Sequence, residues 1–190
     1  LMPVLHLPVQ SGSSKILKLM NRKHKIEDYF KTIYRLKKVK PNIEFSSDFI
    51  IGYPGETDED FDQTLSLINE VKFINSYSFI YSPRPGTPAS DLENIDQQVA
   101  KKRLTIIQKV LEKNRLEYKK KFLKKTVEVL FENKLLNQSK YFGRDKYLNS
   151  VIVNSENNLT GQTLNIKISD YNHNNFFGKI QKNEHNSFAA

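Results

Sequence analysis

One pattern limits the fold of this chain more than any other: an apolar run ends in a polar loop rich in glycine and proline. The pattern occurs three times, in His6-Leu-Pro-Val-Gln-Ser-Gly-Ser13, in Ser46–Thr57 and in Ser76–Pro88. The first two loops lead directly into helical patterns, which favours a parallel sheet with right-handed crossovers. Parallel sheets carry their chemistry at the carboxyl ends of their strands. We therefore expect an α/β fold in which the three loops form part of an active-site rim.

Periodicity predicts the individual elements. Thr57 and Asp60 have the spacing of a capping box, with Asp in place of Glu, and predict the start of one helix. The other expected helices are Ser13–Met20, Ile26–Val39 and Gln97–Leu123. The expected parallel strands are Val4–Val9, Ile43–Gly52 and Ser76–Ser82. Short β-like runs then follow at Thr126–Phe131, Gln138–Phe142, Tyr147–Val153, Thr163–Ser169 and Phe176–Ile180, and they suggest a small β-barrel.

The distribution of charge and the change from helical to β-like patterns divide the chain near Phe122–Thr126. Residues 97–125 hold eleven Lys or Arg and two acids, so this segment carries all of the formal net charge of +9. We expect an α/β domain over 1–122, a β-barrel over 123–183 and a frayed tail over 184–190. No apolar stretch approaches the roughly 20 residues of a membrane span, and we expect a cytoplasmic protein with no membrane partner. The absence of cysteine excludes disulfides, thiolate metal sites and a cysteine nucleophile within this chain.

The strand-end loops hold the candidate binding residues, and each has two interpretations. Gln10-Ser-Gly-Ser13 offers groups that bind ribose hydroxyls or a carboxylate, or it forms a simple turn that caps the next helix. Asp48 interrupts an apolar strand, and it binds a ligand or pairs with a structural Arg. Arg84 lies between two prolines, which suits recognition of a carboxylate or phosphate or a surface Arg in a stiff turn. The four histidines show no metal-ligand spacing. His6 either faces the barrel interior near a cofactor or has a structural role, and we expect the structural role.

The basic segment and the β-rich region together suggest an RNA partner, because lysines beside a small barrel suit phosphate contacts. The candidate RNA-binding residues are Lys119, Lys120, Lys121, Lys124, Lys125, Arg144 and Lys146. The candidate base-stacking residues are Tyr141, Phe142, Tyr147, Tyr171, Phe176 and Phe177. The alternative is a solvated basic face beside aromatic side chains that belong to a core.

The three loops, in this order, resemble the radical SAM tRNA methylthiotransferases. The resemblance rests on His6–Ser13 with Leu17–Arg22, on Ser47–Thr57 and on Tyr77–Ala89. The β-rich region resembles a TRAM domain, an RNA-binding module, with Gly143, Gly161 and Gly178 at its turn positions. The resemblance implies the C-terminal half of a partial (β/α)₆ barrel followed by a TRAM barrel. It also implies a missing N-terminal half, which carries the cysteine ligands of the [4Fe-4S] clusters.

The resemblance further implies a function and a set of contacts. The family uses S-adenosylmethionine (SAM) to add a methylthio group to N6-isopentenyladenosine beside the tRNA anticodon. Gln10, Ser11, Asp48 and Ile50 would contact SAM or the nucleoside, and Arg84 the SAM carboxylate or the RNA. No metal ligand or catalytic residue can be assigned in this chain, and we expect it to be inactive alone. The alternatives are an enzyme acting on N6-threonylcarbamoyladenosine and a non-catalytic RNA-binding remnant.

Overall fold

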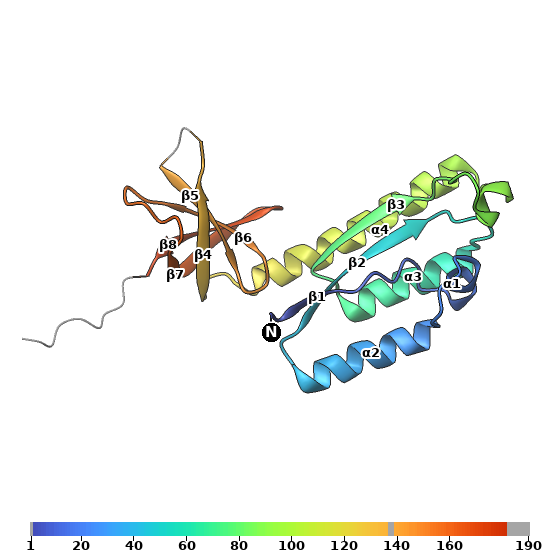
Figure 1. Cartoon of the computed structure of the whole chain (residues 1–190), viewed down its shortest axis with the longest axis horizontal. Coiled ribbons are helices and arrows are strands. Elements are labelled where there is room, and N and C mark those ends of the chain that lie inside the picture. Colours follow the sequence, from blue (N-terminus) through green and yellow to red (C-terminus); the bar gives the residue numbers. More distant parts are fainter. Residues whose placement is uncertain (1, 137–138, 182–190) are drawn as a thin grey trace, which may run out of the picture. The chain divides into compact units, whose positions relative to one another are not determined.

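The computed structural model describes residues 2–136 and 139–181, and these form two compact units (Figure 1). The first unit is Pro3–Arg115, and the second begins at Leu116 and includes Met2. Each unit has its own hydrophobic core. The expected tail over 184–190 lies outside the described residues.

The first unit is built on a parallel sheet, as the loop pattern predicts. Its strands β1 (Val4–His6), β2 (Glu44–Ile51) and β3 (Asn75–Ile80) lie in the order β1-β2-β3. Helices α1 (Ser14–Leu19) and α2 (Ile26–Val39) connect β1 to β2, and α3 (Asp58–Val71) connects β2 to β3. A short 3₁₀ helix, η1 (Pro88–Asp91), precedes α4 (Gln97–Lys120). The predicted alternation of strands and helices is therefore confirmed.

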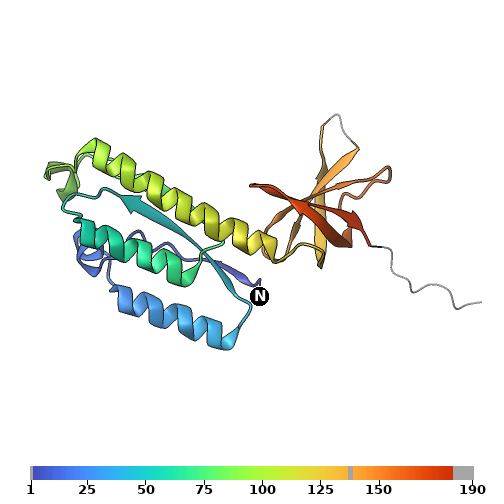
Figure 2. The same cartoon turned by 180° about the vertical axis from the view of Figure 1, so that it is seen from behind.

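The two faces of this sheet differ in burial. Alternate side chains of β2, among them Phe49 and Ile51, pack into a core with residues of α2, α3 and α4, which run alongside the sheet (Figures 1 and 2). The opposite face carries Asp48, which is half-buried, and Tyr77 and Phe79, which are exposed. Helices therefore cover one face of the sheet and leave the functional groups of the other face accessible.

A buried polar residue of α4 connects this helix to α3. Asn114 is buried, and its Nδ2 donates a hydrogen bond of 3.2 Å to the carbonyl oxygen of Ile68 in the last turn of α3. The carbonyls of a final helical turn lack partners within their own helix, so Asn114 supplements the cap of α3. Within the described ranges, no helix is both long enough and apolar enough to span a membrane.

The second unit contains a closed five-stranded barrel with the strand order β4-β5-β6-β8-β7. All pairs are antiparallel except β6 with β8. The strands are β4 (Thr126–Lys134), β5 (Lys140–Asp145), β6 (Ser150–Asn154), β7 (Thr163–Tyr171) and β8 (Asn175–Ile180). Each lies in or beside a predicted β-like run, although Gln138 lies outside the described residues. The prediction of a small β-barrel is confirmed.

Two of the three glycines expected at turns lie within strands instead. A Cβ on Gly143 of β5 would come within 2.5 Å of the Leu130 carbonyl oxygen, and one on Gly178 of β8 within 2.6 Å of the Lys167 carbonyl oxygen. Both glycines therefore allow close approach of neighbouring strands where the sheet curves into a barrel. Gly161, with φ of +80°, does lie in a turn.

Candidate functional site

A cavity of about 890 Å³ opens beside the carboxyl ends of the three parallel strands. Four of the five residues expected at the SAM or substrate site line it together: Gln10, Asp48, Ile50 and Arg84. They come from all three strand-end segments, far apart in the sequence. The remaining lining residues are Leu19, Met20, Asn21, Arg22, Tyr53, Phe79, Ile80, Tyr81, Ser82, Thr87, Pro88 and Ala89.

Gln10 extends the pairing of the sheet beyond β1. Its N–H donates to the carbonyl oxygen of Asp48 at 3.0 Å, and its own carbonyl accepts from the N–H of Ile50 at 3.0 Å. The residue has φ of 78°, in the left-handed region that few side chains favour. Two backbone hydrogen bonds therefore hold this conformation beside the cavity.

Ser11, the fifth predicted residue, does not line the cavity. It is 1% exposed, and its Oγ accepts from the N–H of Ser13 at 3.1 Å and lies 3.4 Å from Thr64 Oγ1. Gly12 fits against α3 because a Cβ there would lie 2.5 Å from the Gln63 carbonyl oxygen. Ser13 caps α1 through Ile16 N–H. The turn-and-cap interpretation is therefore the one observed for Ser11 and Ser13.

Asp48 pairs with a histidine rather than with an arginine. Its Oδ2 lies 3.4 Å from His6 Nε2, and His6 Nδ1 lies 2.9 Å from Ser46 Oγ. The Asp48 side chain is 30% exposed, so its ionised form keeps part of its hydration. His6 has the structural contacts that we expected, and it also orients the carboxylate that lines the cavity.

The loop after β2 is fastened to α4 by a buried ion pair. Arg103 Nη1 donates to Glu56 Oε1 at 2.7 Å, and Nη2 donates to Asp58 Oδ1 at 2.6 Å. Glu56 also accepts from the N–H of Gly52 at 3.2 Å. Burial raises the pKa of Glu56 against the opposing effects of Gly52 and Arg103. These contacts fix the loop that presents Tyr53 to the cavity.

Sequence reasoning missed several cavity residues. Tyr53 and Tyr81 meet edge to face, with ring centroids 4.9 Å apart, and Phe79 and Arg22 complete the wall. The signal for two of them was present, because Tyr77, Phe79 and Tyr81 alternate along one strand and so point to one face. Tyr53 lies in the loop after β2, and Arg22 lies in the loop after α1. In loops the periodicity of the sequence does not predict which way a side chain points.

The loop after β3 presents Arg84 from a stiff turn. The Arg84 carbonyl oxygen accepts from the N–H of Thr87 at 3.2 Å and from its Oγ1 at 2.8 Å. Gly86, with φ of +80°, supplies the conformation that the turn requires. The turn thus orders the backbone and leaves the guanidinium exposed beside the cavity.

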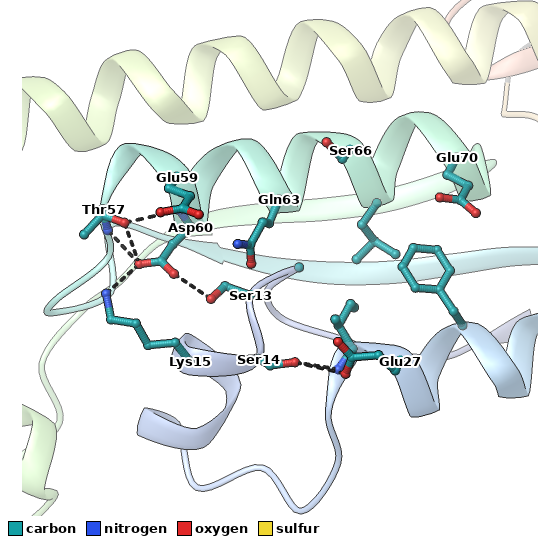
Figure 3. A pocket seen from close by; sticks show the side chains of 14 residues that line it. Ser13, Ser14, Lys15, Glu27, Thr57, Glu59, Asp60, Gln63, Ser66 and Glu70 are labelled. Carbon is teal, nitrogen blue, oxygen red and sulfur yellow. Dashed lines mark hydrogen bonds and ion pairs between the residues drawn. The ribbon is translucent and has the colours of Figure 1, made fainter.

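A second cavity, of about 690 Å³, lies between the α1–α2 region and α3 (Figure 3). Asp60 dominates its wall, accepting from Ser13 Oγ at 2.6 Å, from Lys15 Nζ at 2.8 Å and from Thr57 N–H at 2.9 Å. Burial opposes ionisation of Asp60, but the hydrogen bonds from Lys15, Ser13 and Thr57 outweigh it and lower its pKa. Ser13 caps α1, Thr57 caps α3 in the predicted box with Asp60, and Lys15 forms an ion pair with Asp60.

The first cavity combines the contacts that a nucleoside-sized ligand needs. Ile50, Phe79 and Tyr53 provide apolar surface for a flat ring, while Asp48 accepts hydrogen bonds from a hydroxyl or an amine. Arg22 and Arg84 carry positive charge for a carboxylate or phosphate. The arrangement can bind and orient an adenosine-like molecule with an anionic group.

The prediction that Lys119 binds RNA is wrong. It is 3% exposed, and its Nζ donates to the carbonyl oxygens of Asn172 at 3.0 Å and His173 at 2.8 Å. Its ammonium also lies 5.4 Å from the centre of the Phe176 ring. Lys119 therefore anchors the end of α4 to the barrel. The other predicted basic residues, Lys120, Lys121, Lys124, Lys125, Arg144 and Lys146, are at least partly exposed.

The aromatic side chains of the barrel separate into two groups. Tyr141 and Phe176 are buried in the barrel core, and Tyr171 packs against it. Tyr147 joins a cluster with Tyr118 and Phe122. These residues therefore have structural contacts, in agreement with the alternative interpretation. Only Phe142 and Phe177 among the six candidates are neither in the core nor packed against it nor part of that cluster.

Comparison with known proteins shows what this chain is similar to. The Radical SAM superfamily model matches residues 2–68. The chain is 50% identical over its whole length to a tRNA-2-methylthio-N(6)-dimethylallyladenosine synthase of Pelagibacter ubique, covering 42% of that protein. It is 47% identical over 96% of its length to the synthase of Orientia tsutsugamushi and covers 41% of it. Over its whole length the chain is therefore similar to part of these tRNA-2-methylthio-N(6)-dimethylallyladenosine synthases. It spans about two fifths of the length of these relatives.

A solved structure shows a similar fold over much of this chain. Coproporphyrinogen III oxidase (HemN) from Escherichia coli, a radical SAM enzyme, aligns with 76% of the chain and 41% of its own length. The TM-score is 0.50 at 16% sequence identity, a level that shows similarity of fold alone.

Radical SAM proteins use SAM and iron–sulfur clusters, and the residues of this chain fit only the first. The cavity with Gln10, Asp48, Ile50 and Arg84 has the size and the mixed polarity that an adenosine derivative needs. The chain has no cysteine, and the described residues contain no group of three or more His, Asp or Glu able to hold a metal ion. Residues 2–136 and 139–181 therefore supply no ligand set for a cluster.

Proposed function

We propose that this chain forms the SAM- and RNA-binding part of a tRNA methylthiotransferase that modifies C2 of N6-isopentenyladenosine beside the anticodon. The observation that carries the proposal is the cavity, where Gln10, Asp48, Ile50 and Arg84 meet at the carboxyl ends of parallel strands. The 50% identity to a synthase of that modified nucleoside supports the substrate. The activity belongs to the larger protein, and this chain by itself is inactive because it lacks cluster ligands.

We also propose the finer architecture. The three parallel strands correspond to half of a partial (β/α)₆ barrel, and the five-stranded barrel is a TRAM domain. The functional domains extend over 1–122 and 123–183. The N-terminal half of the same enzyme is the partner that completes the barrel and provides the [4Fe-4S] clusters. Because its substrate is tRNA, we place the enzyme in the cytoplasm.

Each cavity residue has a task in this proposal. SAM, when bound, supplies the radical and methyl chemistry. Arg84 neutralises the SAM carboxylate or a phosphate of the RNA, and Gln10 and Asp48 hydrogen-bond to ligand hydroxyl or amino groups. Ile50, Phe79 and Tyr53 exclude water from the adenosine ring. Ser11 stabilises the backbone of the loop, because its Oγ accepts from the N–H of Ser13, and it does not contact the ligand.

A second candidate keeps the chemistry and changes the nucleoside to N6-threonylcarbamoyladenosine. Mass spectrometry of tRNA nucleosides separates the two, using a strain that lacks the gene containing this sequence. We expect the strain to lose the 2-methylthio derivative of N6-isopentenyladenosine and to accumulate the unmethylthiolated nucleoside. Loss of the 2-methylthio derivative of N6-threonylcarbamoyladenosine instead would establish the second candidate. Unchanged nucleosides would leave a non-catalytic RNA-binding protein.

A further inference from the structure

Three polar side chains of β1 and β2 form a connected row on the open face of the parallel sheet. The pairing register places His6 of β1 beside Ser46 of β2, and Asp48 follows on the same face of β2. Ser46 Oγ lies 2.9 Å from His6 Nδ1, and Asp48 Oδ2 lies 3.4 Å from His6 Nε2. The imidazole of His6 therefore bridges the hydroxyl and the carboxylate through its two ring nitrogens.

The chemistry of the three groups fixes the direction of these contacts. An ionised carboxylate only accepts hydrogen bonds, so the His6 nitrogen that faces Asp48, Nε2, must carry a proton. In a neutral imidazole the other nitrogen, Nδ1, is then an acceptor, and the Ser46 hydroxyl donates to it. Every donor in the row has an acceptor in this arrangement. The Nε2–H tautomer of His6 is therefore the neutral form that satisfies both neighbours.

Stability alone does not explain the row. The His6 side chain is 50% exposed and the Asp48 side chain 30% exposed, and an ion pair with this much exposure contributes little to folding. Leu5 and Leu7, the chain neighbours of His6, pack against the core on the opposite face of the sheet. The row thus lies outside the core, and its last member, Asp48, lines the first cavity.

The row leaves one oxygen of Asp48 for a ligand. Among the residues that the structure describes, the partner of the Asp48 carboxylate is His6, which lies against Oδ2, and no donor lies within hydrogen-bond distance of Oδ1. The other titratable side chains on this face of the three strands are Tyr77, the register partner of Asp48, and Glu44, the register partner of Val4. Oδ1 is therefore an acceptor in place at the cavity.

We propose that His6 and Ser46 are positioning residues, which hold Asp48 Oδ2 so that Oδ1 accepts a hydrogen bond from a ribose hydroxyl in the cavity. An acidic side chain binds a ribose hydroxyl in the same way in dinucleotide-binding folds. Asp48 and Ile50 lie on the same face of β2, about 7 Å apart along the strand. A base packed on Ile50 therefore brings its own ribose close to Asp48. The inference rests on the proposed function, because the adenosine part of SAM would supply the ribose.

Removing a hydroxyl from the ligand tests the proposed contact. The unsubstituted chain and His6→Ala are titrated with SAM, adenosine, 2′-deoxyadenosine and 3′-deoxyadenosine by calorimetry. We expect H6A to bind SAM and adenosine roughly five- to tenfold more weakly, because a hydrogen bond to a charged group is misaligned. For the deoxyadenosine that lacks the contacted hydroxyl, the two proteins should bind equally. A loss in H6A that is the same for adenosine and for both deoxyadenosines overturns the proposal.

Conservative variants separate positioning from a structural role. His6→Gln keeps an N–H donor for Asp48 and should restore most of the affinity, whereas His6→Phe keeps a ring without a donor and should not. The melting temperatures of all three variants should stay close to that of the unsubstituted chain. A merely structural His6 would lower affinity and melting temperature together, without rescue by glutamine. Glu44→Gln is the control, because Glu44 lies on the same face of β2 and does not line the cavity.

The tautomer of His6 gives a spectroscopic readout. Long-range proton–nitrogen NMR correlations at alkaline pH identify which ring nitrogen carries the proton, and H6Q assigns the signals of His6 among those of the other histidines. We expect the Nε2–H tautomer, with a larger share of the other tautomer in Ser46→Ala. A predominant Nδ1–H tautomer in the unsubstituted chain contradicts the proposed row.

Failure of this inference is distinguishable from failure of the proposed function. If the unsubstituted chain binds neither SAM nor adenosine, the SAM part of the proposed function fails together with the inference. If it binds both and H6A binds them equally well, the proposed function stands and the positioning role of His6 is wrong.

Discussion

Arg103 of α4 donates a 2.7 Å hydrogen bond to Glu56, in the loop that follows β2, and both side chains are almost completely buried. This pair joins the helix to the strand-end loop that lines the proposed SAM cavity. Removing one partner from a buried pair leaves an uncompensated charge, which is far more costly than losing an exposed pair. The geometry of the cavity wall therefore depends on a residue outside it.

Arg103→Ala should destabilise the chain by about 3 kcal/mol or more, in the range found when buried pairs are broken. Urea unfolding followed by circular dichroism measures the change. Lys102→Ala is the control, because Lys102 is the exposed neighbour on the same helix. Equal free energies of unfolding for R103A and K102A would contradict this role of Arg103.

Asp60 should make stability depend on pH. Its pKa in the folded state is lower than the usual 3.8, so the folded state binds the proton less tightly than the unfolded state. The stabilisation is complete well above pH 4 and is lost as the pH falls through the folded pKa. Asp60→Asn should cost about 2 kcal/mol at neutral pH, and the difference from the unsubstituted chain should shrink below about pH 4.

Asp62→Asn provides the matched comparison for Asp60. Asp62 lies on the same helix but is exposed, whereas Asp60 is 5% exposed. Urea midpoints for both variants at neutral and acidic pH decide the matter. A pH-independent effect of D60N, or an equal effect of D62N, would show that the hydrogen bonds to Asp60 do not carry the stabilisation.

The lysines at the end of α4 and just after it should separate into binding and structural roles. Replacing Lys120, Lys121, Lys124 and Lys125 with glutamine should weaken RNA binding and flatten its dependence on salt. The log–log slope should fall by about 0.7 for each RNA phosphate that these lysines no longer neutralise. Lys119→Gln should instead lower the melting temperature, because two carbonyl oxygens lose their shared donor. Fluorescence anisotropy over a salt series, with thermal melting of each variant, tests both halves. An unchanged slope in the fourfold variant would exclude these lysines as phosphate-binding groups.

The sequence was sufficient to predict the strands and helices and four of the residues that line the cavity. The apolar runs, the Thr57–Asp60 box and the glycine–proline loops are local signals, and the structure has the corresponding strands, helix start and strand ends. The parallel order then brings Gln10, Asp48 and Arg84 to one side, because strand ends of a parallel sheet meet at one edge.

What the sequence could not provide depends on three-dimensional packing. Ser11 and Ser13 have the same residue type as ligand-binding serines, and only their packing against α3 shows that they are structural. Lys119 sits in a run of three lysines, yet it alone lies against carbonyl oxygens of a distant loop. Phe142 and Phe176 both lie in strands, and the barrel register decides which one faces outward.

The most direct test of the central claim is a transplant. This chain replaces the matching two fifths of the Pelagibacter ubique relative, and the chimera is expressed in a host that lacks its own methylthiotransferase. Mass spectrometry of tRNA nucleosides gives the result. We expect 2-methylthio-N6-isopentenyladenosine from the chimera and a strong loss of it when the chimera carries Arg84→Ala. A soluble chimera that leaves N6-isopentenyladenosine unmodified would contradict the proposed function.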